Sequence, residues 1–411
     1  MTPELLARLD TPAGAAALEA ATELADAPPL AAASALRASG LPPELAAAAH
    51  TQAVLRLRAR AKFGPDAAAM FFTRPGLEQA TRSAVAGRRA HRLAAAGVTR
   101  LADLGCGVGA DALAAARAGI RVHAVDADPL TAAIAAANVR ALGLTDLVSV
   151  SCADARTVDL STVDGVFCDP ARRQGGSRVF DPRAFSPPWD FVAELPERVP
   201  HTVLKLAPGI DHALIPAGAE AEWVSVDGNL VEAAFWCGPL AAVPRRASLL
   251  TSGPLTLTGT GEAALATSGP LTLTGTGEAA APVGPVRGYI YDPDPAVVRA
   301  HLVAEFASTV DGTLADPRIA YVYADSAVPT GFARCFEVTD TMPLSLKRLR
   351  AVLRERGVGR LTIKKRGSAL DPEQLRRRLH IEGPAEATII LTRVDDSPTV
   401  LFATPVPRLS S

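Results

Sequence analysis

The sequence has few cysteines and no long apolar run, and both absences limit what the protein can be. Its five cysteines are scattered over 411 residues without a C-x-x-C pair, so neither a disulfide framework nor a structural zinc site is expected. No uncharged apolar stretch reaches the roughly 18 residues of a membrane-spanning helix. The first residues, MTPELLARLD, lack the basic start and apolar core of a signal peptide. We therefore expect a cytoplasmic protein that binds neither metal nor membrane.

The chain also has almost no net charge. A value of −1 at neutral pH gives the whole molecule no attraction to nucleic acid. This average hides an asymmetry, because residues 331–411 hold 15 Lys and Arg against 9 Asp and Glu, an excess of +6 that leaves −7 for the rest. With 48% hydrophobic residues the composition is that of a globular protein, and the length predicts two or three domains.

The pattern of apolar residues changes along the first part of the chain. Residues 1–95 are rich in Ala and Leu and predict an α-helical N-terminal domain of short helices, broken near Pro28-Pro29 and Pro42-Pro43. Residues 96–245 alternate strand-like with helical runs, which predicts a doubly wound parallel sheet. The sheet is expected to end in an antiparallel hairpin with Asp227-Gly228 as its turn. The predicted fold of this part is Rossmann-like α/β.

The second part of the chain begins with a predicted linker, residues 246–330. In it TSGPLTLTGTGEAA, residues 251–264, recurs unchanged at 267–280. One duplication cannot build a solenoid, so we expect an exposed loop or loose hairpin without a site. Residues 288–308, GYIYDPDPAVVRAHLVAEFAS, then predict a strand-like start and an amphipathic connecting helix. Residues 331–411 then read strand, helix, strand, helix, strand, strand, which predicts an α+β domain of the ferredoxin-like kind.

The most informative motif is LADLGCGVGAD, residues 101–111. Gly105, Gly107 and Gly109 form a turn from a strand into a helix, and glycines let the backbone pass close to a ligand. The glycines alone do not identify that ligand, because their spacing also fits a nicotinamide dinucleotide fingerprint. A nicotinamide-dependent oxidoreductase therefore remains an alternative at this point.

Four aspartates close four successive predicted strands: Asp103, Asp126, Asp154 and Asp169. The carboxyl ends of parallel strands border the crevice in which open α/β sheets bind ligands. Asp103 would repel a pyrophosphate but attract the ammonium group of a cofactor that carries an amino acid. Asp126 can accept both ribose hydroxyls of either cofactor, and Asp154 could accept from an adenine amino group. The four acids together favour the cofactor with the ammonium group.

Residues 101–170 resemble the class I S-adenosylmethionine-dependent methyltransferases. The resemblance implies that S-adenosyl-L-methionine is the cofactor, with its methionine part at Asp103 and the glycine turn and its ribose at Asp126. It implies further that Asp154 and Ala155 bind the adenine. From about residue 55 to 405, apart from the duplicated loop, the chain resembles a narrower family. The motifs FFTRPGLEQAT (71–81), DPARR and LKLAPGID, with the basic C-terminal part, are similar to bacterial methyltransferases with a C-terminal THUMP-like domain, common in actinobacteria.

The pair Asp169-Pro170 is the predicted catalytic loop. In amino-nitrogen methyltransferases a D/N-P-P-aromatic loop accepts hydrogen bonds from an NH₂ group and stacks the base, so that it acts mainly by orientation. Asp169 and the Pro170 carbonyl could do the same here. The stacking aromatic is missing at position 172, and Phe180 or Trp189 could replace it. The sequence SPPW at 186–189 resembles the D/N-P-P-aromatic motif but lies well past the fourth strand.

Asp-Pro-Ala-Arg also resembles a motif of uracil-C5 RNA methyltransferases. Those enzymes need a cysteine nucleophile after the fifth strand, where this chain reads KLAPGID. Cys168 lies in an apolar strand and is expected to be buried rather than reactive. Methylation of an exocyclic or ring nitrogen of an RNA base is therefore the preferred hypothesis. A non-catalytic RNA-binding protein on a methyltransferase scaffold remains an alternative.

Basic residues indicate where a nucleotide substrate would bind. Arginine forks suit phosphate, and Arg172 and Arg173 follow the catalytic loop. Lys205, near the end of the fifth strand, is either a substrate contact or a lysine that snorkels to solvent. Two clusters near the C-terminus are expected to form one phosphate-binding patch, although a solvated face is the alternative: Lys364, Lys365, Arg366, Arg376, Arg377 and Arg378. THUMP-type domains bind RNA, so the resemblance supports an RNA partner. The sequence does not indicate an oligomeric state.

A further basic run, LRLRARAKFG, ends the N-terminal helical region. It contains Arg56, Arg58, Arg60 and Lys62. The pattern fits either a solvated helix face or a nucleic-acid contact.

Overall fold

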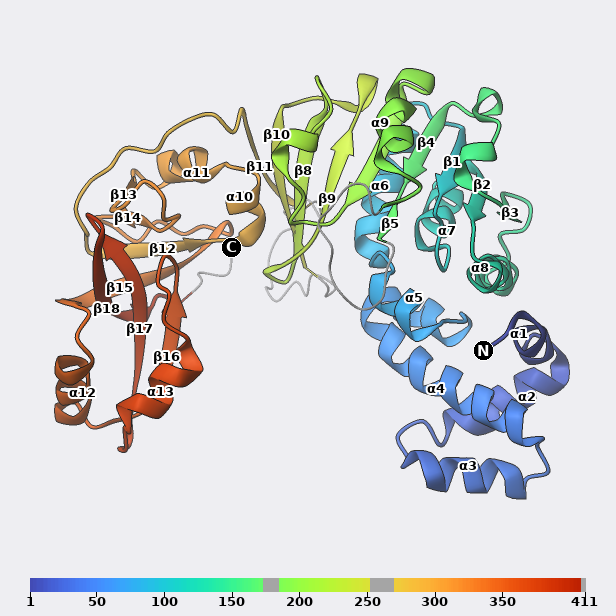
Figure 1. Ribbon diagram of the computed structural model, residues 1–411, viewed down its shortest axis with the longest axis horizontal. Coiled ribbons are helices and arrows are strands. Elements are labelled where there is room, and N and C mark those ends of the chain that lie inside the picture. The colour runs from blue at the N-terminus through green and yellow to red at the C-terminus, as the bar shows by residue number, and fades with distance from the viewer. Residues whose placement is uncertain (173–184, 252–269, 408–411) are drawn as a thin grey trace, which may run out of the picture. The chain divides into compact units, whose positions relative to one another are not determined.

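The computed structural model describes residues 1–172, 185–251 and 270–407 (Figure 1). The chain forms two compact units, of which the first holds Met1–Glu220 and Ala233–Ala242 and the second holds Ala221–Glu232 and Val243–Ser411. The domain boundaries expected at residues 95, 245 and 330 stay predictions. In the ranges just given, no helix is long and apolar enough to cross a membrane.

The first unit begins with short helices, as predicted. The first four each begin at a proline: α1 (Pro3–Leu9), α2 (Pro12–Thr22), α3 (Pro29–Ala38) and α4 (Pro43–Phe63). Proline suits a first helical turn because its φ is already helical and its missing N–H would have no partner there. The helices α5 (Arg74–Gln79) and α6 (Ser83–Ala95) follow. Buried Leu and Ala side chains of this region share one hydrophobic core with the sheet that comes next.

The sheet of the first unit has the strand order β9-β7-β4-β1-β2-β3. Five strands pair in parallel: β1 (Arg100–Leu104), β2 (Arg121–Asp126), β3 (Val148–Cys152), β4 (Gly165–Cys168) and β7 (His201–Leu206). β9 (Asn229–Trp236) pairs antiparallel with β7. The connecting helices are α7 (Ala110–Arg117), α8 (Pro129–Ala141) and α9 (Trp189–Arg198). This confirms the predicted Rossmann-like sheet with an antiparallel strand, and it brings the carboxyl ends of β1 to β4 and β7 to one edge.

The other strand of the predicted hairpin, β8 (Glu220–Val226), continues into the second unit and pairs with further strands there. Strand β8 pairs in parallel with β10 (Arg245–Leu250), which pairs antiparallel with β11 (Leu271–Gly275). β11 lies in the second copy of the duplicated sequence, where a loop or loose hairpin was expected. The alternation of Leu and Thr in LTLTG explains why this copy can add a strand to an edge. Most of the first copy falls outside the described residues.

A second sheet of this unit has the order β13-β14-β12-β15-β18-β17-β16. Its C-terminal part follows the predicted order, with β15 (Ala333–Pro343), α12 (Leu346–Glu355), β16 (Val358–Lys365), α13 (Pro372–Leu379), β17 (Ala385–Val394) and β18 (Ser397–Pro405). The remaining elements come from the predicted linker: β12 (Tyr289–Pro293), α10 (Pro295–Arg299), α11 (Val303–Thr309), β13 (Thr313–Leu314) and β14 (Val322–Ala324). β12 lies on the strand-like run expected there and pairs with β15, whereas β13 and β14 were not expected.

Candidate active site

The glycine turn joins β1 to α7 at the edge where the parallel strands end. Its first glycine, Gly105, has a φ of +86°, a conformation that side chains rarely adopt. A Cβ there would lie 2.7 Å from the backbone oxygen of Asp169, so the turn and the Asp-Pro loop are in backbone contact. The Gly105 and Cys106 N–H groups donate to the Val125 carbonyl at 2.9 and 3.0 Å. The two predicted functional loops therefore meet at this edge.

Asp103 is fully buried beside the turn, where the charges of Arg89 and Lys205 offset the effect of burial only in part. Neither carboxylate oxygen has a hydrogen-bond partner within the described part of the chain. Burial, and after it the charges of Asp111 and Asp169, raises the pKa of the Asp103 carboxyl well above its usual range. A buried carboxylate without a partner is costly, and an ammonium group would supply both charge and hydrogen bonds. This orphaned acid fits the amino-acid end of S-adenosylmethionine.

Arg89 lies next to Asp103 but is bound elsewhere. It is buried on α6, forms an ion pair with Asp111 and lies 4.5 Å from the centre of the Phe167 ring. Sequence reasoning did not single out this arginine, because it occurs in a helix that carries several other arginines. Arg89 binds the first turn of α7, directly after the glycine turn.

Asp126 connects the end of β2 to the same turn. Its two oxygens accept from the N–H of Gly107 at 3.1 Å and from the N–H of Asp128 at 3.0 Å. Burial raises the pKa of this carboxyl. Each carboxylate oxygen has about two acceptor positions, so both can still accept a hydroxyl, as the ribose role requires.

Asp154 lies in a different environment from the one expected for an adenine contact. Its side chain is 41% exposed and binds Arg156, with a Nη2–Oδ2 distance of 2.6 Å. An adenine amino group would have to share this carboxylate with the guanidinium. Ala155 is buried at the start of the short turn that follows. The adenine role of both residues stays a prediction.

Asp169 forms an ion pair with Lys205. The Nζ–Oδ2 distance is 2.5 Å, and the side chains are 35% and 12% exposed, respectively. Register explains the pair, because β4 and β7 are neighbours with Cys168 opposite Leu204. The Lys205 side chain therefore points to the predicted catalytic carboxylate rather than out to solvent.

After the buried Pro170 the backbone forms a two-stranded ribbon. Strand β5 (Ala171–Arg172) pairs antiparallel with β6 (Phe185–Ser186), with Ala171 opposite Ser186. The ribbon brings the SPPW segment back beside the Asp-Pro loop, although the two are far apart in sequence. Trp189 lies edge-on to Phe185, with 6.0 Å between the ring centres. Arg173 and Phe180 lie outside the described residues.

Several side chains of the predicted basic patch of the second unit bind partners within the protein, and its role in phosphate binding stays a prediction. Lys364 and Arg366 both bind Asp292, at 2.8 and 2.9 Å. Lys365 donates instead to the Leu370 carbonyl, because successive side chains of a strand point to opposite faces. Arg376 binds the Leu361 carbonyl and Glu373. Four of the six residues thus have partners in the protein.

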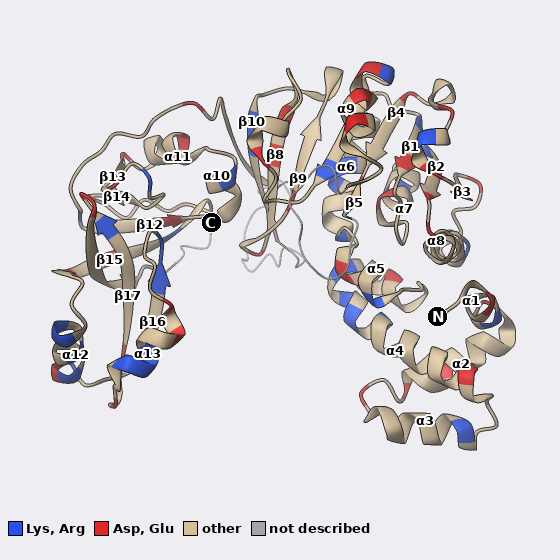
Figure 2. Ribbon diagram, viewed as in Figure 1, with Lys and Arg blue, Asp and Glu red and all other residues tan. Residues whose placement is uncertain are grey.

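Exposed positive charge gathers on two helices of this unit, α12 and α13 (Figure 2). An Arg350 N–H donates to the Arg378 carbonyl, which joins α12 to α13. Five exposed residues of the two helices, named here the α12–α13 cluster, are Lys347, Arg348, Arg354, Arg377 and Arg378. Sequence reasoning found the last two and missed the first three, although KRLR at 347–350 was a visible signal.

Two of the four basic residues at the end of α4 bind the chain's own backbone, while Arg58 and Arg60 are exposed. Lys62 Nζ donates to the carbonyls of Leu77, Glu78 and Ala80 at 2.7, 2.7 and 2.9 Å. Burial, followed by the nearby charges, lowers the pKa of Lys62 to about 8. Arg56 donates to the carbonyls of Met70 and Ala69 at 2.8 and 3.1 Å. These two residues stabilise the segment that carries the motif FFTRPG.

Three parts of the chain match known sequence families. Residues 101–172 match a methyltransferase domain, and residues 333–405 match a family described as THUMP domain-like. Residues 2–59 match a domain of unknown function.

Two curated proteins and one solved structure are similar over most of the chain. Both proteins, from the CDC 1551 and H37Rv strains of Mycobacterium tuberculosis, are named uncharacterized S-adenosylmethionine-dependent methyltransferases. Each is 34% identical over 352 residues, which cover 83% of this chain and 91% of the relative. The crystal structure of a putative methyltransferase from Porphyromonas gingivalis W83 has a TM-score of 0.72 at 22% identity. It covers 95% of this chain and 97% of its own, and it shows a shared fold.

Proposed function

The chain belongs to the S-adenosylmethionine-dependent methyltransferases, and from this premise we propose that it methylates a nitrogen of an RNA base. The family decides against the nicotinamide-dependent alternative and confirms the resemblance seen in the sequence, including the THUMP-like domain. The cofactor is S-adenosyl-L-methionine. When bound, it supplies an electrophilic methyl group.

The cofactor site of the proposal consists of Asp103, the glycine turn, Asp126 and the Asp154-Ala155 pair. The unpartnered carboxylate of Asp103 supports the ammonium contact. Asp126 already orients the turn through the Gly107 N–H, so one residue would both bind the ribose and position the turn. Such preorganised donors and acceptors need little rearrangement on binding.

One observation carries the acceptor side of the proposal: the ion pair of Asp169 and Lys205 next to the glycine turn. The ion pair restricts the rotation of the Asp169 carboxylate. A carboxylate oxygen of Asp169 can accept a hydrogen bond from an NH₂ group, and the Pro170 carbonyl could accept a second. Two such bonds orient the nitrogen lone pair, and orientation is the main contribution that this chemistry needs. Lys205 is then a residue that positions Asp169, rather than a direct phosphate contact.

The cysteines argue against the covalent route to a ring carbon. Cys106, in the glycine turn, and Cys168, next to Asp169, are buried, and burial raises the pKa of both thiols well above the usual range. Cys152 is exposed, but it ends β3 near the proposed adenine residues and not in the Asp-Pro loop. A thiol that stays protonated is a poor nucleophile. A nitrogen acceptor needs no such nucleophile.

Trp189 is the proposed platform for the base. The β5–β6 ribbon brings its helix back to the Asp-Pro loop, and the ring is only half-buried. The Trp189 ring is T-shaped to that of Phe185, and a base could stack on the part of the ring that stays exposed. Trp189 would thus replace the aromatic residue that the sequence lacks at position 172.

The α12–α13 cluster supports RNA as the substrate class. Exposed Lys and Arg side chains on two adjoining helices attract a phosphate backbone. Arg172 and Arg173 would add contacts beside the catalytic loop. The THUMP domain-like match supports the same class of partner.

Nucleoside mass spectrometry of total RNA from a deletion strain and its parent tests the proposal. We expect one base methylated at nitrogen to disappear in the deletion strain and to return with the wild-type gene. A gene carrying Asp169→Asn, which keeps the shape but not the charge, should restore little of it. Loss of a C5-methylated pyrimidine, or unchanged RNA in all strains, would overturn the proposal.

A further inference from the structure

The buried amide of Asn138 connects the glycine turn to another part of the first unit. Asn138 lies on α8 and is fully buried. Its Nδ2 donates to the Val108 carbonyl at 2.9 Å and to the Phe71 carbonyl at 3.1 Å, and its Oδ1 accepts from the Phe71 N–H at 2.6 Å. Both donors of the amide are used. Val108 is the residue between Gly107 and Gly109, so one side chain binds the turn and the Phe71 backbone together.

The segment from Phe71 to Gly76 also packs directly against the turn. A Cβ on Gly76 would lie 3.0 Å from Cγ1 of Val108. The next residue of this segment, Phe72, is bound by the buried Gln52 of α4. Gln52 donates to the Phe72 carbonyl at 2.7 Å and accepts from the Phe72 N–H at 2.9 Å. Gln52 makes no hydrogen bond to the turn. The two buried amides thus make similar contacts to successive residues, but only Asn138 reaches Val108.

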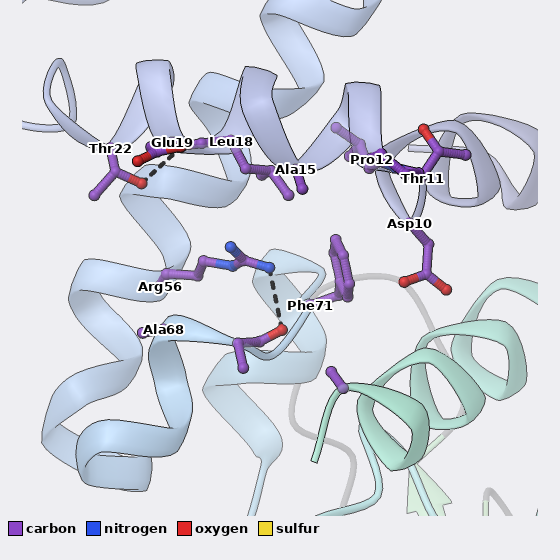
Figure 3. A pocket seen from close by; sticks show the side chains of 13 residues that line it. Asp10, Thr11, Pro12, Ala15, Leu18, Glu19, Thr22, Arg56, Ala68 and Phe71 are labelled. Atoms are coloured by element: carbon purple, nitrogen blue, oxygen red, sulfur yellow. Dashed lines mark hydrogen bonds between the residues drawn. The ribbon is translucent and has the colours of Figure 1, made fainter. Parts of the chain in front are cut away.

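A cavity borders the outer side of Phe71. Its volume is about 470 Å³, and Phe71, Arg56 and Ala141 are among the residues that line it (Figure 3). Arg56 stacks on the Phe71 ring at 4.8 Å. Because packing on this side is incomplete, the hydrogen bonds to Asn138 contribute strongly to the position of the Phe71 backbone.

We propose that Asn138 is a positioning residue for S-adenosylmethionine. A buried carbonyl without a donor is costly, so loss of the Asn138 amide would make Val108 turn its carbonyl toward another partner. That rotation would also move the Gly109 N–H, which shares the Val108–Gly109 peptide plane and donates to the Cys106 carbonyl, so the shape of the glycine turn in the proposed cofactor site would change.

The test compares Asn138→Ala with Gln52→Ala. Both variants lose two or three buried hydrogen bonds and should melt at a lower temperature than the wild type. Calorimetric titration with S-adenosylmethionine should give an affinity about tenfold weaker for Asn138→Ala, the effect of roughly one buried hydrogen bond. Gln52→Ala should bind within about twofold of the wild type, since the effect of a distant contact is small. Equal affinities in the two variants would overturn the inference.

A second variant keeps the test decisive if Asn138→Ala does not fold. Gly76→Ala leaves all Asn138 hydrogen bonds in place and brings a methyl group within 2.8 Å of Thr73 Oγ1 and 3.0 Å of Val108 Cγ1. It should also weaken cofactor binding, and unchanged affinity would count against the inference. Asp126→Ala separates this inference from the proposed cofactor site on which it rests. Normal binding by Asp126→Ala would defeat the site itself. Weak binding by Asp126→Ala with normal binding by Asn138→Ala and Gly76→Ala would defeat only the positioning role.

Discussion

Two basic runs of the sequence look alike but serve different purposes in the structure. In the first unit, Arg56 and Lys62 donate to five backbone carbonyls between residues 69 and 80. In the second unit, Arg377 and Arg378 point outward from α13 and are exposed. Carbonyls at helix ends and in loops need donors from elsewhere, and α5 lies within reach of Lys62. A basic run therefore indicates nucleic-acid binding only where the protein leaves its charges unused.

Two aspartates, one in each unit, also differ in whether the protein supplies partners for them. Asp103 is buried without a partner, whereas Asp292 is bound by Lys364 and Arg366. A buried carboxylate without a hydrogen-bond partner is rare in a protein interior and indicates a ligand. A carboxylate with two cations around it is a structural ion pair. Predictions that separate cofactor, fold and RNA effects follow from this contrast.

The largest expected effect is on turnover, from Asp169→Ala. Without the carboxylate the acceptor nitrogen is not oriented, so turnover should fall about 10²-fold or more, with S-adenosylmethionine affinity nearly unchanged. Single-turnover kinetics and calorimetry measure the two quantities.

A matched control separates the carboxylate from the lysine that it leaves unpaired. The double variant Asp169→Ala, Lys205→Met removes the orphaned ammonium as well. If the double variant recovered turnover, the loss would come from the unpaired Lys205, and Asp169 would not be an orienting group.

Asp126→Ala should have the next largest effect, on cofactor affinity. It removes the ribose acceptors and also the acceptor of the Gly107 N–H. Binding of S-adenosylmethionine should weaken by about 1.5–3 kcal/mol, as for hydrogen bonds to a charged group. RNA binding should not change. Calorimetry measures the affinity for S-adenosylmethionine, and filter binding measures the affinity for RNA. A variant with normal cofactor affinity would remove Asp126 from the site.

Lys62→Met should affect stability and not ligand binding, because Lys62 binds only backbone carbonyls. The variant should melt at a lower temperature than the wild type. The folded pKa of Lys62, about 8, lies below the value of about 10.4 for an unfolded lysine. Between these values the unfolded chain binds more protons, so this residue makes folding more favourable as pH rises.

The advantage of the wild type over Lys62→Met should therefore grow from pH 8 to pH 10. Chemical denaturation at several pH values measures it. A constant difference across this range would mean that the folded pKa is not lowered.

Much of the fold and of the cofactor site could be predicted from the sequence, because local sequence patterns determine these features. Alternating apolar runs specified the parallel sheet, and the spacing of the aspartates placed four acids near one edge. Contacts set by tertiary packing could not be predicted. The Lys205–Asp169 pair depends on the register of β4 and β7, and the position of Trp189 depends on the β5–β6 ribbon. Asn138 carries no local signal, since a lone Asn in an Ala-rich helix resembles a surface residue.

The smallest expected effect is on RNA affinity, and it distinguishes the α12–α13 cluster from the basic residues at the end of β16. Changing Arg377 and Arg378 to Gln removes exposed charges only, so the melting temperature should stay within experimental error. RNA affinity should fall, and the slope of log affinity against log salt should become shallower by about 0.7–0.9 for each phosphate that the protein no longer neutralises. Lys364 and Arg366 changed to Gln form the matched control, with two charges removed from the same domain. That control should lower stability, because Asp292 loses both partners, while the salt slope should stay near the wild-type value. If the control flattened the slope and the helix variant did not, RNA would bind the sheet face, and the α12–α13 cluster would be only a solvated surface.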